Sequence, residues 1–356
     1  MVNFVSVSHL KSGMILARDI YGIDSFTSKV VMLRAGQELT VSIITKMMRM
    51  ELIGVYVQGN DNFDKEHQLV DTTTKKEILE SIHQIYDLSN RTTEALFAGT
   101  ISHANDVLEK LVDTIIGNPN MYIDIYSLRV YDDCTYNHSL GVTVLSIAIG
   151  KSLGLSRKSL SQLALCALLH DIGKMQVPIE IISKPGKLTD EEFAEIKKHP
   201  KKGGSILKKD DLVSDLILNG VMSHHEKVDG TGYPNGLKGK NIPLFGRIVS
   251  CADVYDALTS TRPYRTPATP AEAIEYIMGS AGRQFDRGVV KGFLKCISPY
   301  PVGSCVNLST GDTAVIVEQN SHNPMRPKIF MMDKPSVIVD LFNDEHYLDV
   351  VIDTLC

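Results

Sequence analysis

The middle of the chain repeats one local pattern, in which apolar residues recur at helical spacing after a residue that can cap a helix. Ser156 precedes one such segment. Residues 189–192 and 269–272 each fit the S/T-x-x-E capping box, and Pro270 stands at the first helical position of the second box. Similar apolar stripes fill the rest of this region. We therefore expect an all-helical domain over residues 131–297.

Both ends of the chain have β character instead. Residues 1–58 read as short strands and turns around one helical turn, and residues 298–356 contain the alternating runs SCVNLST, GDTAVIVEQ and PKIFMMD, followed by PSVIVDL. Residues 59–130 join these parts, as a polar linker over 59–73 and then connecting helices. The expected fold is mainly α, with a small N-terminal β-rich module and a short C-terminal β tail.

The composition is that of an ordinary folded protein. Of the 356 residues, 43% are hydrophobic and 22% charged, which excludes wholesale disorder. The net charge of −5 lacks the excess of positive charge that is typical of proteins that bind DNA or RNA. It does not exclude binding of a small phosphorylated ligand. The six cysteines form no close pair, and no stretch approaches the ~20 apolar residues of a membrane span. We expect a cytoplasmic protein without disulfides or a thiolate zinc site.

Histidine is the residue type with an uneven distribution. Five of the 11 histidines occupy inward-facing or terminal positions of the expected helices: His138, His170, His199, His224 and His225. Asp171 and Asp253 occupy similar positions. Any one of these alone reads more simply as a core residue or a buried cap, but their convergence indicates a shared cation. Neutral imidazoles with carboxylates suit iron, manganese or zinc.

The number of these side chains favours two metal ions over one. Six or seven ligands exceed the four of a tetrahedral site, and Asp171 can bridge because a carboxylate has two oxygens. Two metal ions about 3.5–4 Å apart activate a shared water and clamp a phosphoryl group, which predicts phosphoester hydrolysis. Lys174, one helical turn beyond Asp171, is placed to neutralise charge on the phosphate, although elsewhere in the chain it would read as a solvated lysine.

Three motifs connect these residues with a known family: HDIGK at 170–174, HHEKVDGTGYP at 224–234 and ADVYDALTSTRPYR at 252–265. In this order they resemble the HD-GYP subgroup of the HD-domain phosphohydrolases, and the second motif fits H-H-E-x-x-D-G-x-G-Y-P at every fixed position. The likeness covers residues 131–297 and implies an all-helical HD-type catalytic domain. The N-terminal module and the C-terminal tail also look like segments that accompany such domains.

The resemblance implies a metal-dependent phosphodiesterase. HD-GYP proteins hydrolyse cyclic di-GMP to pGpG, with GMP as a further product left open here, through a hydroxide between two metal ions. One metal would be held by His138, His170, Asp171 and Asp253, and the other by Asp171, His199, His224 and His225. Lys174 would act with Asp171 in catalysis by contacting the scissile phosphate. Arg262 and Arg265 would bind substrate phosphates, and Tyr233 would touch the substrate or a partner protein.

The first helix of the domain bears on the number of metal ions. Cys134 stands where family members with three metals carry a glutamate, although an offset of one residue would bring Asp133 into play. We therefore expect two divalent ions, iron or manganese.

Two other functions stay open at this point. One is a preference for cyclic GMP-AMP within the same enzyme class. The other is a protein that binds, without hydrolysis, the dinucleotide or a GGDEF-type cyclase, the latter through the loop that carries the GYP residues 232–234 (the GYP loop). The sequence does not fix the oligomeric state, and a homodimer is compatible with it.

Overall fold

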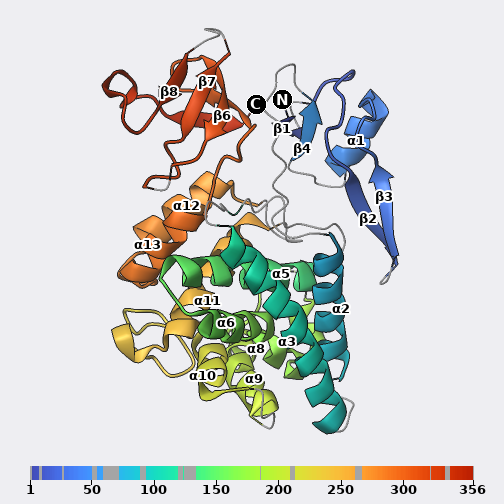
Figure 1. Cartoon of the computed structure of the whole chain (residues 1–356). Coiled ribbons are helices and arrows are strands. Elements are labelled where there is room, and N and C mark those ends of the chain that lie inside the picture. Colours follow the sequence, from blue (N-terminus) through green and yellow to red (C-terminus); the bar gives the residue numbers. More distant parts are fainter. Residues whose placement is uncertain are drawn as a thin grey trace. The chain divides into compact units, whose positions relative to one another are not determined.

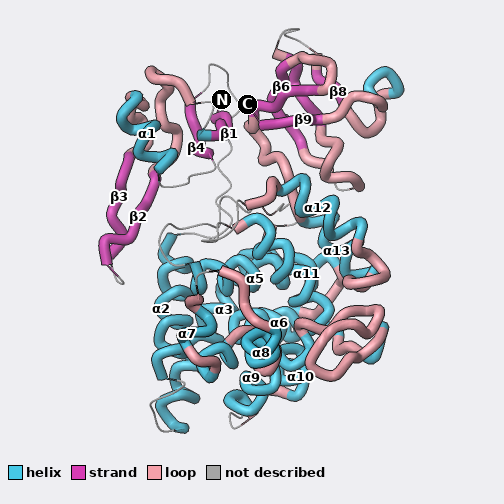
Figure 2. Tube along the Cα trace, turned by 180° about the vertical axis from the view of Figure 1, so that it is seen from behind, coloured by secondary structure: helices cyan, strands magenta, loops and turns pink. Residues whose placement is uncertain are grey.

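The computed structural model describes residues 2–7, 10–25, 28–49, 54–58, 72–88, 94–118, 123, 134–184, 186–208, 213–260, 267–320, 322–332 and 337–355. The chain divides into two compact units (Figures 1 and 2). The first contains Met1–Gln68, Arg129–Asp132 and Ile297–Cys356, and the second contains Leu69–Leu128 and Asp133–Cys296. The strands named below belong to the first unit, and the long helices belong to the second.

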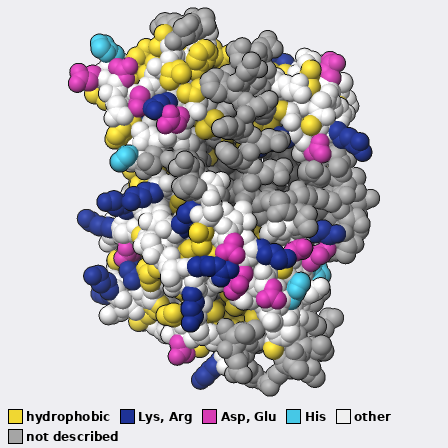
Figure 3. All heavy atoms as spheres, in the orientation of Figure 1, with side chains coloured by type: hydrophobic (Ala, Val, Ile, Leu, Met, Phe, Trp, Pro, Cys, Tyr) yellow, Lys and Arg dark blue, Asp and Glu magenta, His cyan; other side chains and the backbone are white. Residues whose placement is uncertain are grey.

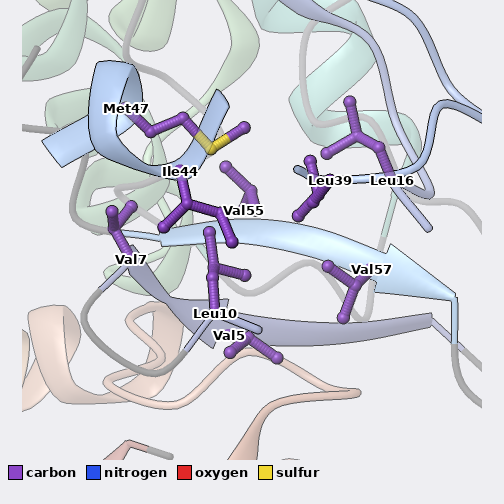
Figure 4. Close-up of a cluster of buried hydrophobic side chains, with 9 residues drawn as sticks. All are labelled: Val5, Val7, Leu10, Leu16, Leu39, Ile44, Met47, Val55 and Val57. Carbon is purple, nitrogen blue, oxygen red and sulfur yellow. The ribbon is translucent and has the colours of Figure 1, made fainter. Parts of the chain in front are cut away.

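The N-terminal part of the first unit is a small β-rich module. β1 (Val2–Ser6) pairs antiparallel with β4 (Gly54–Gln58), β2 (Ile20–Ser25) pairs antiparallel with β3 (Ser28–Leu33), and α1 spans Val41–Arg49. Figure 4 shows its buried side chains: Val5, Val7, Leu10, Leu16, Leu39, Ile44, Met47, Val55 and Val57. Val55 and Val57 are two residues apart in β4 and so reach the same face. The expected single helical turn is a helix of nine residues.

The C-terminal part of the first unit is a five-stranded antiparallel sheet with the order β8-β7-β6-β5-β9. The strands are Cys305–Leu308 (β5), Thr313–Glu318 (β6), Lys328–Met331 (β7), Ile338–Asp340 (β8) and Ile352–Leu355 (β9), with a short 3-10 turn (η4) at Glu345–Tyr347. The first four strands lie in the four runs expected from the sequence. The fifth, β9, is an addition, because the exposed pair Asp353 and Thr354 breaks the alternation of a half-buried strand.

The types of side chain on the surface differ between the C-terminal sheet and the helices. Figure 3 shows hydrophobic side chains gathered over the β7 and β8 end of the C-terminal sheet, whose exposed apolar residues include Met332, Ile338 and Phe342. Over the helices on the same face, Lys and Arg side chains are interspersed with Asp and Glu side chains. Mixed charge of this kind keeps a helical surface solvated.

The second unit is a helical bundle around α5 (Cys134–Ser152). Residues 139–150 are all buried, so this helix is enclosed on every side. α6 (Arg157–Leu169) packs against it, α3 (Glu94–Gly117) packs on both, and α2 (Thr72–Leu88) packs on α3 and α5. The remaining elements are η2 (Ile172–Gln176), α7 (Ile179–Ile182), α8 (Asp190–Ile196), α9 (His199–Leu207), α10 (Asp215–Ser223), η3 (Gly239–Asn241), α11 (Leu244–Thr259), α12 (Pro270–Gly279) and α13 (Arg287–Cys296).

Three helix starts predicted from capping residues are confirmed. The Ser156 hydroxyl accepts a hydrogen bond from the Ser159 N–H at 3.2 Å at the start of α6. The boxes at 189–192 and 269–272 each make both of their reciprocal hydrogen bonds, at the starts of α8 and α12. Caps are predictable because both partners are a few residues apart in the sequence.

Two observations bear on the ends and links of the chain. Within the described segments, no helix is both long enough and apolar enough to cross a membrane. The linker expected over residues 59–73 lies outside the described residues up to position 71, and α2 already begins at Thr72.

Candidate metal centre

Four helix ends and one helix interior supply the side chains of the centre. His138 lies near the start of α5, His170 ends α6, His199 begins α9, and His224 ends α10 with His225 after it. Asp171 follows His170, and Asp253 projects from α11. The centroids of neighbouring imidazole rings are 4.2–5.3 Å apart. The structure thus brings together all seven side chains that were expected to hold metal.

Asp171 divides this cluster into two halves. Its Oδ2 lies 3.3 Å from His170 Nε2, 3.9 Å from His138 Nε2 and 2.5 Å from Lys174 Nζ. Its Oδ1 lies 3.2 Å from His199 Nε2 and 3.9 Å from His224 Nε2. Each oxygen of one carboxylate therefore faces a different set of imidazoles, as a bridging ligand between two cations requires.

The ligand atoms form two groups that share Asp171. One group is His138, His170 and Asp171, and the other is Asp171, His199, His224 and His225; within each group the atoms lie within 4.8 Å of one another. Asp253 adjoins the cluster, with Oδ1 3.2 Å from His138 Nε2 and Oδ2 3.9 Å from His225 Nδ1.

Backbone carbonyls orient three of the rings. The Nδ1 atoms of His170, His199 and His224 lie 2.6–2.8 Å from the carbonyl oxygens three residues earlier in the chain. A carbonyl oxygen only accepts, so each Nδ1 donates a proton, and in the neutral form of each ring the lone pair of Nε2 faces inward. This tautomer is the one that a metal ion needs.

Protonation states also suit metal ligation. Burial would raise the pKa of Asp171, but the Lys174 ammonium and the nearby imidazoles hold that pKa well below its usual value. Burial and neighbouring imidazoles lower the pKa of His224 well below that of free histidine, and burial lowers the pKa of His225 to about 4. The carboxylate is thus ionised and these two imidazoles are neutral at pH 7, and metal ions bind those forms.

His138 carries the opposite shift. Burial opposes its charged form, but hydrogen bonds to Asp253 and Asp256 outweigh this effect and raise the pKa of His138 to about 10. The pKa of Asp253 is lowered, because the hydrogen bond and charge of His138 outweigh its burial. A metal ion held by His138 and Asp253 would therefore take the place of a proton.

Two features of the cluster fit a bound cation. His170 Nε2 is buried and makes no hydrogen bond of acceptable geometry among the described residues. His199 Nε2 and His224 Nε2 lie 3.2 Å apart although both rings donate through Nδ1. Converging lone pairs and an orphaned buried nitrogen fit divalent metal ions held by imidazole and carboxylate.

Asp256 is a functional residue that sequence reasoning missed. Its Oδ2 lies 2.7 Å from His138 Nδ1 and accepts a hydrogen bond from the Ser260 hydroxyl at 3.1 Å. The carboxylate fixes the His138 ring so that Nε2 faces the centre. A signal was present in the sequence, since Asp256 stands three residues after Asp253 and so shares its helix face.

Glu226 is the second missed residue. This buried carboxylate accepts the backbone N–H of Asn235 at 2.7 Å and of Leu237 at 3.0 Å, and the Tyr233 N–H donates to the His225 carbonyl at 3.2 Å. Glu226 therefore folds the GYP loop back onto the centre. The Tyr233 ring packs against His225 with centroids 4.8 Å apart, and Tyr233 is half-buried.

Some of the expected residues lie outside the described part of the chain. Arg262 and Arg265 belong to a segment, 261–266, that the structure does not describe. Asp133, just before α5, also lies outside the described residues. Cys134 begins α5, but its side chain is also outside the description.

A family model and several curated proteins are similar to this chain. Residues 121–289 match the family model of the HD domain. A cyclic di-GMP phosphodiesterase of Pseudomonas aeruginosa is 39% identical over 247 residues, which cover 67% of this chain and 59% of the relative. A 3'3'-cGAMP-specific phosphodiesterase of Vibrio cholerae is 38% identical over 143 residues, which cover 40% of this chain and 27% of the relative. The chain thus spans less than two thirds of these curated relatives.

A solved structure shares the fold. The HDG"Y"P protein of Bdellovibrio bacteriovorus superposes with a TM-score of 0.52 and 20% identity, over 82% of this chain and 98% of that protein. The mainly helical architecture expected from the sequence is thereby confirmed. Residues 121–289 thus belong to the HD-domain family, and the three motifs described above resemble those of its HD-GYP subgroup.

Proposed function

We propose that this chain is a metal-dependent phosphodiesterase that opens cyclic di-GMP to pGpG, with its catalytic domain over residues 131–297. The observation that carries the proposal is the cluster of buried Nε2 atoms around the two oxygens of Asp171. The phosphodiesterase relatives support the reaction class. Cleavage of pGpG to GMP is a second step that the same assay measures.

The cofactor we propose is a pair of divalent ions, iron or manganese. One ion is assigned to His138, His170, Asp171 and Asp253, and the other to Asp171, His199, His224 and His225. When bound, such a pair supplies an activated water and a positive charge that binds the phosphoryl oxygens. Three metal equivalents per chain, measured on protein purified without chelator, would contradict the number.

The chain's own residues then bind and orient the phosphate. Lys174 Nζ donates to Asp171 Oδ2, and its side chain is 37% exposed, so its other N–H donors are able to meet a phosphate oxygen. That ammonium offsets charge that accumulates on the phosphate in the transition state. We assign Arg262 and Arg265 to the remaining phosphate oxygens, which their guanidinium groups fit.

The test is hydrolysis by the full chain loaded with iron or manganese in reducing buffer, with products separated by chromatography. Asp171→Ala removes the shared carboxylate and is expected to abolish turnover. His346→Ala is the matched control, because His346 is exposed and distant in sequence from the motifs. Absence of turnover in the loaded wild-type chain with either metal contradicts the proposal.

A second substrate deserves the same assay, because one relative is named as specific for 3'3'-cGAMP. Competition between cyclic di-GMP and cyclic GMP-AMP gives the ratio of their kcat/KM values, and a ratio in favour of the second replaces the substrate proposed here.

The remaining alternative is a protein that binds without hydrolysis. If a cellular phenotype survives the double change His170→Ala and Asp171→Ala, the binding function is favoured. Binding of a GGDEF-type cyclase at the GYP loop, and a homodimer, are parts of the proposal that pull-down and sedimentation experiments test.

A further inference from the structure

A second group of side chains lies at the rim of the centre, next to the GYP loop. The Tyr233 ring packs against the His225 ring at 4.8 Å. Lys197 Nζ lies 5.9 Å from the centre of the Tyr233 ring and 4.5 Å from the centre of the Phe193 ring. These contacts lead from the metal centre outward to Phe193, which is 44% exposed. An exposed phenyl ring thus stands beside an ammonium at the edge of the site.

Helix geometry holds the two side chains together. Phe193 lies in α8 and Lys197 ends that helix, where its backbone N–H donates to the Phe193 carbonyl at 3.0 Å. Residues four apart share one helix face. His199 follows only two residues later, so the same turn of chain that carries Lys197 delivers a candidate metal ligand.

Lys197 differs from its neighbours in its charge partners. Lys198 and Lys202 both pair with Glu195, each at 2.6 Å. Across the described ranges no carboxylate pairs with Lys197, and its ammonium lies over aromatic rings instead. Lys197 is also half-buried, which limits its hydration. An ammonium in this setting is available to an anionic ligand.

We propose that Phe193 and Lys197 form a subsite for the part of the substrate that does not react. One nucleobase of the dinucleotide stacks on the Phe193 ring, and Lys197 binds the phosphate that is not cleaved. This inference rests on the proposed function and specifies how that site holds a nucleotide. Every nucleobase has a π face, so the subsite adds affinity for either cyclic dinucleotide without selecting between them.

Steady-state kinetics give the first test. Loss of one base stack in Phe193→Ala is expected to raise KM about 5- to 150-fold, with kcat within about twofold, because the interaction exists equally before and during the reaction. Phe342→Ala, which removes an exposed ring of the same size from the turn after β8, is expected to leave KM unchanged.

The charge is tested in the same way. Lys197→Gln is expected to raise KM and to reduce its dependence on ionic strength, since one attraction between an ammonium and a phosphate, which salt screens, is removed. Lys291→Gln, at an exposed position of α13, is the matched control and keeps the wild-type KM and salt dependence.

A binding signal that does not need turnover separates the two proposals. The chain contains no tryptophan, so Phe193→Trp creates a single fluorescent reporter that keeps an aromatic ring at this position. Rapid mixing of this full-length, metal-loaded variant with cyclic di-GMP is expected to quench the fluorescence saturably. Phe342→Trp is expected to show no quenching.

The outcomes are distinct. Quenching at position 193 without product formation supports the subsite and contradicts the enzyme. Product formation without quenching, together with an unchanged KM in Phe193→Ala, overturns the subsite and leaves the enzyme in place. Absence of both signals overturns both.

Discussion

His138 Nδ1 lies 2.7 Å from Asp256 Oδ2, across a sequence separation of 118 residues. This contact joins the start of α5 to α11 and aims Nε2 of the imidazole at the metal centre. Three of the other histidines use a backbone carbonyl from their own segment for the same purpose. His138 alone among these four depends on a distant side chain, so its orientation is open to a point mutation.

We expect Asp256→Ala to lower the affinity for metal about 10- to 100-fold, because the His138 ring loses its orienting acceptor. Asp256→Asn keeps an acceptor oxygen and is expected to lose less. Titration of chelator-treated protein with manganese measures both, and Asp349→Asn, at an exposed position, is the control. Equal affinities in wild type and Asp256→Ala would falsify the role of Asp256.

Gly173 is expected to tolerate no side chain. A Cβ on this residue would overlap the His199 carbonyl oxygen and the Gly203 amide nitrogen, which are backbone atoms of α9. We expect Gly173→Ala to cost more than about 2 kcal/mol of folding free energy and to displace His199. Gly99→Ala is the control, because Gly99 has open space in α3, and there we expect a gain of about 0.5–1 kcal/mol. Thermal unfolding of the two variants decides the matter.

Glu226 is expected to hold the GYP loop closed. Glu226→Gln places an amide N–H against one of two backbone N–H donors, so we expect a loss of about 1–3 kcal/mol. Hydrogen exchange at the amides of Asn235 and Leu237 is expected to speed up, while exchange in α12 stays unchanged. Unaltered protection of the two amides would show that the loop closes without this carboxylate.

The pair of Asp286 and Arg247 predicts a dependence of stability on pH. Arg247 Nη1 lies 2.8 Å from Asp286 Oδ2, and Asp286 Oδ1 also accepts the N–H groups of Gly288 and Val289 at the start of α13. Burial would raise the pKa of Asp286, but these hydrogen bonds outweigh it, and the pKa is lowered. The stabilisation is thus present above the pKa of the unfolded chain and is lost as the pH falls through the lower pKa of the folded protein.

Two variants separate the charge of Asp286 from its helix cap. Asp286→Asn keeps a capping oxygen and is expected to cost about 1–2 kcal/mol at pH 7. This difference shrinks as the pH falls from the pKa of an unperturbed aspartate, about 3.9, through the lower pKa of the folded protein. Asp286→Ala also loses the cap and is expected to cost about 0.5–2 kcal/mol more at every pH. Urea unfolding at several pH values measures both, and a difference for Asp286→Asn that stays constant down to low pH would contradict the assignment.

Local signals in the sequence were enough for much of the fold. Thr189 and Thr269 predicted their helices because a capping box involves neighbours only. The histidines at helix ends predicted a convergent cluster, and the structure brings them together. By contrast, β9 escaped detection because its exposed Asp353 and Thr354 break the alternation of a half-buried strand, so that only its pairing with the distant β5 identifies it.

The supporting shell of the centre was harder to foresee for the same reason. Asp256 gains its meaning only from the position of His138, on another helix. Glu226 acts on backbone amides, and a sequence does not show which amides of a loop turn toward a carboxylate. Close approaches such as that of Gly173 to α9 depend on how two segments pack.

The imidazole rings of the centre touch one another mostly edge to face, from His138 through His170 and His224 to His199 and His225. Each imidazole ring packs against its neighbour and limits the positions that this neighbour can take. Loss of one ring therefore leaves the next ring free to move. The five histidines are therefore expected to be constrained as a unit. In a gene copy that no longer needed the metal centre, the first substitution of a histidine would remove the packing constraint on the other four. Related sequences are therefore expected to keep all five histidines or to lose several of them.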